Sequence, residues 1–231
     1  MDAKIHILFY ESSEDPARAL PYFSDSRKQK YFHSVNPKVR FQQAAAELAV
    51  CAAMKEAGFP FEPPEYSYDG LGRPCMKDAF LSISHTDRTA ACIVFSKPVG
   101  LDMEAERRIN PALANKILCS REFSEFSESR DQNGFLLGTW VVKESFLKFT
   151  GTGLRSGMKN TDFNAAKSTV SDQCGQKYFV SRHQLSSPFR SSPDFTGRKT
   201  DYFISLCTQK PVETGFIIYN SFADIISYLK K

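Results

Sequence analysis

Residues 79–104 read AFLSISHTDRTAACIVFSKPVGLDME. This stretch contains three short runs of strand-forming residues, separated by the turn sequences HTDR and SKP: Ala79–Ser84, Ala90–Phe95 and Val99–Glu104. Runs of this length, rich in β-branched and aromatic residues and bounded by Asp, Ser and Pro, are typical of strands joined by tight turns. We therefore predict three consecutive strands arranged as a meander.

The segment before these strands predicts one more strand and two helical regions. The mostly apolar run 5–10 predicts the strand, and residues 15–33 favour helix. The next helix begins at Asn36, which can cap it, and Pro37, whose missing N–H costs nothing in a first turn. This helix ends near Gly58. Its small apolar residues recur at helical spacing and favour close packing: Ala44, Ala45, Leu48, Ala49, Ala52 and Ala53.

The segment after the strands has the same order of helices before strands. Residues 110–149 predict helix in pieces broken around Ser120 and at 131–134, and Gly151 ends the last piece. Three strands and a short helix capped by Ser221 complete the chain; the strands are Lys177–Ser181, Asp201–Thr208 and Gly215–Tyr219.

This repeated order predicts an α+β protein with two halves of similar size. We place the N-terminal α+β half at residues 1–105 and the C-terminal α+β half at residues 106–231. No self-similarity of sequence accompanies this order, so a symmetry between the halves would be structural.

Composition excludes several classes of protein. Of 231 residues, 42% are hydrophobic and 24% are charged, which is enough apolar material for a substantial core. A net charge of +4 is low for a nucleic-acid binder. The six cysteines are scattered without a C-x-x-C pair, and no apolar run is long enough to span a membrane. We expect a cytoplasmic monomer that binds neither nucleic acid nor membrane.

Two acidic side chains share one face of the third predicted strand. Because side chains alternate along a strand, Gly100, Asp102 and Glu104 lie on one face, and the apolar residues between them lie on the other. The two carboxylates then stand about 6.5 to 7 Å apart at their Cα atoms. Such a pair suits an oxygen-bound Mg²⁺, and Gly100 leaves room for a ligand against the backbone. A half-exposed edge strand whose acids face water is the alternative interpretation.

A carboxylate and an ammonium group share one face of the last helix before Gly151. In WVVKESFLK, residues 140–148, the side chains of Glu144 and Lys148 project together. This pair can serve a metal and a phosphate, and the alternative is a surface ion pair. The glycines at 151 and 153 provide a flexible exit beside the charged face and favour the first interpretation.

Two further segments offer groups for an anion. Ser84, His85 and Thr86 can donate hydrogen bonds to phosphate oxygens, although a structural turn histidine is the plainer interpretation. Neighbouring residues in a strand face opposite ways, which argues against a catalytic Ser–His pair. Basic residues near the second helix suit a compact anion site or a solvated helix face: Arg27, Lys28, Lys30, Lys38, Arg40 and, downstream, Arg73.

Four motifs together resemble a known family. They are GRP at 72–74, SHT at 84–86, GLDME at 100–104 and WVVKESFLKFTGTGL at 140–154. In this order and spacing they resemble the 4′-phosphopantetheinyl transferases of the Sfp-like, surfactin-synthetase-activating branch. The resemblance covers roughly residues 27–154, and the last hundred residues add little beyond length and strand pattern.

The resemblance implies a fold and a reaction. The fold has two structurally similar α+β halves, related by a pseudo-twofold axis, with coenzyme A in the cleft between them. In the reaction, which requires Mg²⁺, a serine of an acyl or peptidyl carrier protein attacks the pyrophosphate of coenzyme A. The phosphopantetheine arm is transferred, and 3′,5′-ADP leaves.

The resemblance also assigns roles to residues. Asp102, Glu104 and Glu144 match the Mg²⁺ ligands, and Lys148 matches the pyrophosphate contact. Either Glu144 or a metal-bound water is the base, and the sequence does not choose between them. The contacts to the rest of coenzyme A match basic and hydroxyl positions: Lys28, Arg40, Arg73, Ser84 and His85, with His85 near the 3′-phosphate.

Two departures and two rival functions accompany this interpretation. Many relatives have Lys where this chain has Arg73, and the segment before Phe32 matches loosely, so Arg27 or Lys30 can replace Lys28 in its role. One rival is a Mg²⁺-dependent phosphotransferase or pyrophosphohydrolase that uses water as acceptor. The other is a coenzyme A-binding or scaffold protein. The sequence indicates neither the class of carrier, whether fatty-acid, polyketide or nonribosomal-peptide, nor the residues that contact it.

Overall fold

The computed structural model describes residues 2–60, 63, 66–70, 72–153, 157–190 and 199–231. The chain splits into two compact units. The first contains Met1–Lys97 and Glu213–Lys231, and the second contains Pro98–Val212. These bounds differ from a division at residue 105 because the third predicted strand pairs within the second unit and the last strand pairs within the first.

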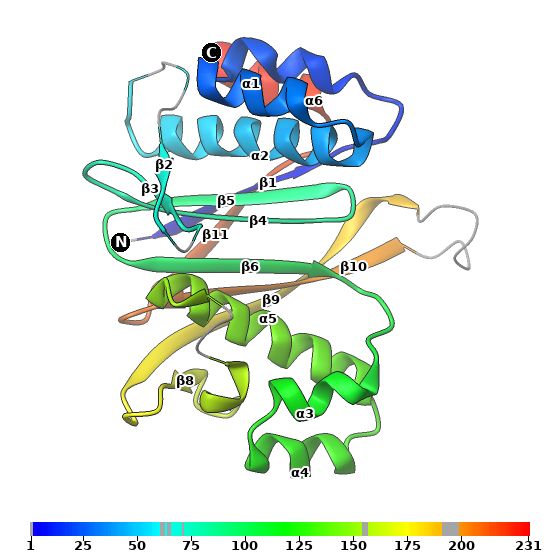
Figure 1. The fold of residues 1–231 in the computed structure, drawn as a ribbon, viewed down its shortest axis with the longest axis vertical. Coiled ribbons are helices and arrows are strands. Elements are labelled where there is room, and N and C mark those ends of the chain that lie inside the picture. The colour runs from blue at the N-terminus through cyan, green and yellow to red at the C-terminus, as the bar shows by residue number, and fades with distance from the viewer. Residues whose placement is uncertain (1, 61–62, 64–65, 71, 154–156, 191–198) are drawn as a thin grey trace. The chain divides into compact units, whose positions relative to one another are not determined.

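The first unit is built on a four-stranded sheet in the order β11-β1-β5-β4 (Figure 1). Its strands are β1 (Ala3–Phe9), β4 (Phe80–Thr86), β5 (Thr89–Phe95) and β11 (Thr214–Tyr219). β4 and β5 form the predicted hairpin, and the turn between them places Asp87 at a positive φ of 39°. β1 runs parallel to β11, which joins the two ends of the chain in one sheet. A separate short pair is formed by β2 (Ser67–Tyr68) and β3 (Pro74–Cys75).

Helices cover one face of this sheet (Figure 1). They are η1 (Pro16–Tyr22), α1 (Asp25–His33), α2 (Pro37–Glu56) and α6 (Phe222–Lys230). The predicted cap of α2 is confirmed, because the Asn36 side chain accepts a hydrogen bond of 2.9 Å from the Lys38 N–H. Its small-residue stripe is buried, as predicted, and Ser221 caps α6. The small side chains allow α2 to pack closely on β5 and β1.

The predicted meander is wrong at its third strand. β6 (Val99–Ala105) pairs along its whole length with β10 (Lys199–Thr208) in a second sheet, whose order is β6-β10-β9-β8-β7. The other strands of this sheet are β7 (Asp162–Asn164), β8 (Thr169–Ser171) and β9 (Lys177–Arg190). The turn sequence SKP indicates that the chain changes direction but not which strand it meets next. Pairing with a strand about a hundred residues away carries no local signal.

The helical region of the second unit breaks where the sequence predicted. Its pieces are η2 (Pro111–Leu113), α3 (Ala114–Ile117), α4 (Ser120–Glu128) and α5 (Gln132–Thr150), followed by η4 (Met158–Asn160). The Asp131 side chain accepts a hydrogen bond of 2.8 Å from the Gly134 N–H at the start of α5. Gly151 ends α5 in the left-handed conformation at φ 70°, where glycine lacks the Cβ that would clash.

Gly100 lets α5 lie directly against β6. A Cβ atom at this position would stand 2.0 Å from the Ser145 carbonyl oxygen and 2.4 Å from the Phe149 nitrogen. Both are backbone atoms, so the helix would have to move to make room. The prediction that Gly100 leaves space for a ligand is therefore wrong, because the helix backbone fills that space. The face of β6 that carries Asp102 and Glu104 is the face that α5 covers.

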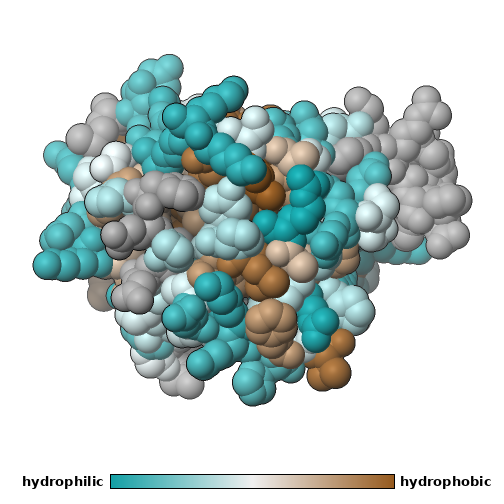
Figure 2. All heavy atoms as spheres, turned by 90° about the horizontal axis from the view of Figure 1, so that it is seen from above, coloured by the Kyte–Doolittle hydropathy of each residue, from teal (hydrophilic) through white to brown (hydrophobic). Residues whose placement is uncertain are grey.

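Two further features of the structure concern its hydropathy: the distribution of polar residues on the surface and the length and apolarity of the helices. Figure 2 shows one face of the molecule, where hydrophilic residues cover most of the coloured surface and hydrophobic residues form small groups. Within the described ranges, each helix is either too short or insufficiently apolar to cross a bilayer.

Replacing Gly100 by alanine is expected to destabilise the second unit. The added methyl must displace the backbone of α5, so the free energy of unfolding should fall by about 1–3 kcal/mol or more. Gly138→Ala on the same helix is the matched control, because a Cβ there meets nothing within 4 Å. Because alanine has a higher helix propensity than glycine, Gly138→Ala should leave the free energy of unfolding unchanged or raise it by up to about 1 kcal/mol. Urea unfolding followed by circular dichroism compares the two; equal effects would contradict the close contact at Gly100.

Candidate functional site

Helix α5 and strand β6 bring together the acidic and basic groups that the sequence predicted. Lys148 Nζ donates a hydrogen bond of 2.8 Å to Oδ1 of Asp102, across from β6 to α5. The Asp102 side chain is 7% exposed and that of Lys148 is 31% exposed. A nearly buried carboxylate paired with a half-buried ammonium is more than a solvated surface pair.

Glu144 lies in the electrostatic field of the same group. The pKa of Glu144 is raised to about 7, first by burial and then by the carboxylates of Asp102 and Glu104, while the Lys148 ammonium opposes the rise. These influences require all four side chains to lie near one another. The alternative of an edge strand with both acids facing water is wrong for Asp102, which is buried under α5.

Glu104 lies at the outer part of this group. It is half-buried, and its Oε2 lies 3.6 Å from the Arg107 Nε. The group therefore combines three carboxylates with one lysine, and oxygen ligands of this kind suit Mg²⁺. Burial first, and then the charges of Asp102 and Glu104, disfavour the ionised form of Glu144, and a divalent cation beside these acids would offset that cost. The residues thus fit the metal that the family resemblance implies.

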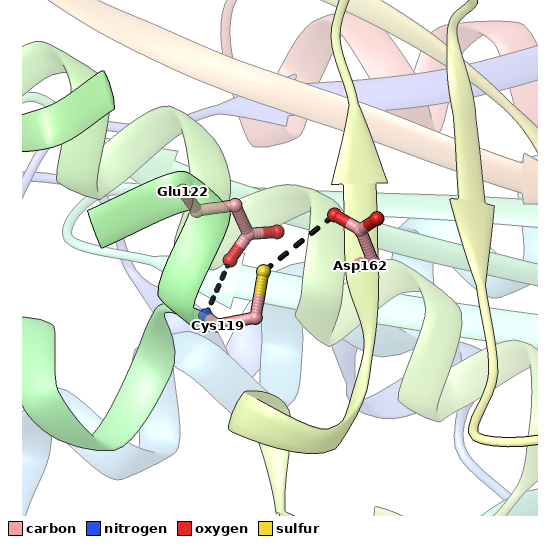
Figure 3. A group of neighbouring side chains, drawn as sticks. All are labelled: Cys119, Glu122 and Asp162. Carbon is pink, nitrogen blue, oxygen red and sulfur yellow. Dashed lines mark hydrogen bonds between the residues drawn. The ribbon is translucent and has the colours of Figure 1, made fainter. Parts of the chain in front are cut away.

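Another set of side chains is packed more tightly. Among the described residues, Cys119, Glu122 and Asp162 form the one group of three metal-ligand types whose ligand atoms all lie within 4.8 Å of one another. Figure 3 shows the Cys119 thiol directed at Asp162, 3.5 Å from its Oδ1, and the Glu122 carboxylate at the Cys119 N–H, 2.8 Å away. Asp102, Glu104 and Glu144 are not gathered to that distance.

Protein cations already neutralise the Cys119, Glu122 and Asp162 group. Lys143 Nζ donates to Glu122 Oε2 at 2.6 Å, and Arg121 donates to Asp162 Oδ1 at 2.5 Å. Each carboxylate has its own counter-ion, so the group is explained as part of the packing between α4, α5 and β7. Sequence reasoning missed Lys143 and Glu122. The available signal was the position of Lys143 four residues from Leu147, on the buried side of the helix, where the neighbouring residues are mostly apolar.

The predicted phosphate contacts at the end of β4 lie in the first unit. Ser84 is buried and His85 is exposed, which confirms that they face opposite ways and argues against a Ser–His pair. His85 is therefore accessible to a ligand, whereas the Ser84 side chain faces inward.

The predicted basic contacts also lie in the first unit and differ in accessibility. Lys28 is half-buried and lies 3.3 Å from Asp25, whereas Arg73 is exposed and lies 3.2 Å from Asp69. Arg40 is half-buried, and its Nε donates a hydrogen bond of 2.7 Å to the Ser34 carbonyl.

Arg27 is a poor replacement for Lys28. It is 8% exposed, lies 3.3 Å from Glu47 and stands 4.0 Å above the centre of the Tyr66 ring. Burial and these partners commit its guanidinium to holding α1 on α2 and the β2–β3 region. Lys30, which is exposed, is the better of the two alternatives.

Comparisons with known proteins point to one family. Residues 98–207 match the model of the 4′-phosphopantetheinyl transferase superfamily. The 4′-phosphopantetheinyl transferase Sfp of Bacillus subtilis (strain 168) is 25% identical over 149 residues, covering 62% of this chain and 66% of the relative. A holo-acyl-carrier-protein synthase of Thiobacillus denitrificans (strain ATCC 25259 / T1) is 38% identical over 65 residues, covering 25% of this chain and 50% of the relative.

A solved structure aligns more weakly. The holo-acyl-carrier-protein synthase of Thermotoga maritima aligns with a TM-score of 0.33 and 22% identity, covering 49% of this chain and 64% of that chain. The chain spans two thirds or less of the length of each of these relatives. The superfamily match contains β6 and α5, and therefore all four members of the Asp102, Glu104, Glu144 and Lys148 group.

The raised pKa of Glu144 makes a prediction about stability against pH. The folded chain holds this proton more tightly than the unfolded chain, so Glu144 favours folding most below its ordinary pKa of 4.5. That contribution is lost as pH rises through about 7. Between pH 5 and 8, in EDTA, the unfolding free energy of wild type should therefore fall relative to that of Glu144→Gln. A difference that stays constant with pH, measured by urea unfolding, would show that burial and the charges of Asp102 and Glu104 do not raise the pKa of Glu144 in the folded chain.

Proposed function

The match over residues 98–207 makes this chain a member of the 4′-phosphopantetheinyl transferase superfamily, and from that premise we propose its reaction. It transfers the 4′-phosphopantetheine arm of coenzyme A to a serine of an acyl or peptidyl carrier protein and releases 3′,5′-ADP. The observation that carries the proposal is the group of three carboxylates and one lysine between β6 and α5. Carrier-protein substrates are supported by the relatives' names, which include a holo-acyl-carrier-protein synthase.

Asp102, Glu104 and Glu144 would hold the Mg²⁺ ion. When bound, Mg²⁺ neutralises negative charge on the diphosphate of coenzyme A. Lys148, which lies 2.8 Å from Asp102, adds positive charge beside the same diphosphate. Glu144 is the carboxylate placed to accept the proton of the attacking serine, because it is half-buried and its pKa is raised to about 7.

The remaining part of coenzyme A is assigned to the first unit. Lys28, Arg40, Arg73 and His85 provide positive or hydrogen-bonding groups for its nucleotide end, and the Ser84 side chain, which faces inward, is left out of this set. The pseudo-twofold relation and the cleft for coenzyme A stay predictions, as do the cytoplasmic location and the monomeric state.

Transfer is favoured over the rival of hydrolysis. The same carboxylates serve a pyrophosphohydrolase equally well, since both reactions break the diphosphate. The relatives that match this chain are named as transferases or as a carrier-protein synthase, which favours the carrier serine over water as acceptor. The other rival, a protein that binds coenzyme A without catalysis, is disfavoured because carboxylates alone would repel the diphosphate of coenzyme A.

Mass spectrometry of an apo carrier protein incubated with coenzyme A and Mg²⁺ tests the reaction. The carrier should gain the mass of one phosphopantetheine, and fatty-acid, polyketide and nonribosomal-peptide carriers should be compared. Asp102→Asn and Glu144→Gln should each slow transfer by on the order of 10²-fold or more. Glu125→Gln, an exposed carboxylate on α4, is the control and should keep full activity. Loss of coenzyme A without a change in carrier mass would establish hydrolysis instead.

Recognition of the 3′-phosphate gives a second test. His85→Ala should raise the KM for coenzyme A by about tenfold, the effect of one hydrogen bond to a charged group. The KM for 3′-dephospho-coenzyme A should stay unchanged, because that substrate lacks the phosphate. His33→Ala is the control, since His33 is also an exposed histidine of the first unit. An equal rise for both substrates would remove His85 from the 3′-phosphate site.

A further inference from the structure

Lys143, the residue directly before Glu144, is fully buried. Its Nζ donates to the carboxylate of Glu122 at 2.6 Å and to three backbone carbonyls. These carbonyls are Ile117 at 2.8 Å, Thr161 at 2.8 Å and Met158 at 3.1 Å. We call these four oxygens the Lys143 cage. An ammonium group has three N–H bonds, so the cage satisfies all of them.

Glu122 extends the cage to further elements. Its Oε2 also accepts the Cys119 N–H at 2.8 Å, and its Oε1 accepts the Phe163 N–H at 2.7 Å. The cage therefore joins the end of α3, the start of α4, the turn after η4 and β7 to one point on α5. A buried ammonium and a buried carboxylate are each costly alone, and together they hold this geometry firmly.

The cage and the Gly100 contact restrain α5 in different ways. Contact with the Gly100 backbone sets how closely α5 approaches β6. A single point of close approach still allows the helix to turn about its axis. The cage holds a side chain on another side of the helix, and it restrains that turn together with the Ser145–Ser205 hydrogen bond and the apolar packing of α5. Successive residues of a helix differ by about 100° in direction, so fixing Lys143 fixes Glu144.

We propose that Lys143 is a positioning residue for the metal site, and that its cage orients Glu144 toward Asp102 and Glu104. This inference rests on the proposed function, because it takes these three carboxylates to be the metal ligands. Lys143 touches neither the metal nor coenzyme A. It acts through the rotation of α5, as residues that support a metal ligand commonly do.

Binding of Mn²⁺ tests the inference without requiring transfer. Mn²⁺ binds the same oxygen ligands as Mg²⁺, and its free concentration is measured by electron paramagnetic resonance in the presence of coenzyme A. Lys143→Met should weaken Mn²⁺ binding by about tenfold or more. Leu137→Ala is the matched control, because Leu137 is a fully buried residue of the same helix that has no part in the cage. It should lower the melting temperature without weakening Mn²⁺ binding.

Glu122→Gln provides a milder variant of the same cage. It keeps the shape of the side chain and removes its charge, so it should weaken Mn²⁺ binding in the same direction and by less than Lys143→Met. Unchanged Mn²⁺ affinity in the folded Lys143 or Glu122 variant would overturn the inference, as would an equal loss in Leu137→Ala. Wild type that binds no Mn²⁺ would overturn it too.

The failure of the proposed function has a different signature. If wild type binds Mn²⁺ and the cage variants weaken that binding, the positioning role of Lys143 holds, even where no carrier protein gains mass. The reaction would then be reassigned and the metal site kept.

Discussion

The close contact between Gly100 and the backbone of α5 is the constraint on which the second unit depends. It brings a helix directly onto the face of β6 that carries Asp102 and Glu104, and so places Lys148 at 2.8 Å from Asp102. A larger residue at position 100 would hold the helix away from the strand. The charged group exists because a strand and a helix, about forty residues apart in sequence, meet without side chains between them at this point.

The charges of the Asp102, Glu104, Glu144 and Lys148 group destabilise the folded chain and at the same time suit a bound cation. Three carboxylates near one lysine repel one another, and the pKa of Glu144 rises to about 7 because burial and two like charges disfavour its ionised form. Ordinary packing gives no reason to keep such a group. The Glu122–Lys143 pair in the same unit is the contrast, since there a carboxylate and an ammonium balance each other within a satisfied network of hydrogen bonds.

Local sequence patterns predicted the helix ends and the faces of the strands. They did not predict which strands pair when the partners are far apart in sequence. Asn36, Asp131, Gly151 and Ser221 mark helix ends because capping is chemistry between neighbours in sequence. The face shared by Asp102 and Glu104 followed from strand alternation, but the partner of β6 did not, because β10 lies about a hundred residues away. The role of Gly100 was misjudged for the same reason. Sequence showed a missing side chain, and only the fold showed that a helix backbone occupies its place.

Anomalous X-ray diffraction from crystals grown with Mn²⁺ and coenzyme A would test the central claim most directly. One strong manganese peak is expected, in contact with carboxylate oxygens of Asp102, Glu104 and Glu144 and with an oxygen of the diphosphate. A peak at Cys119, Glu122 and Asp162, or a diphosphate bound away from β6 and α5 with no manganese beside it, would contradict it.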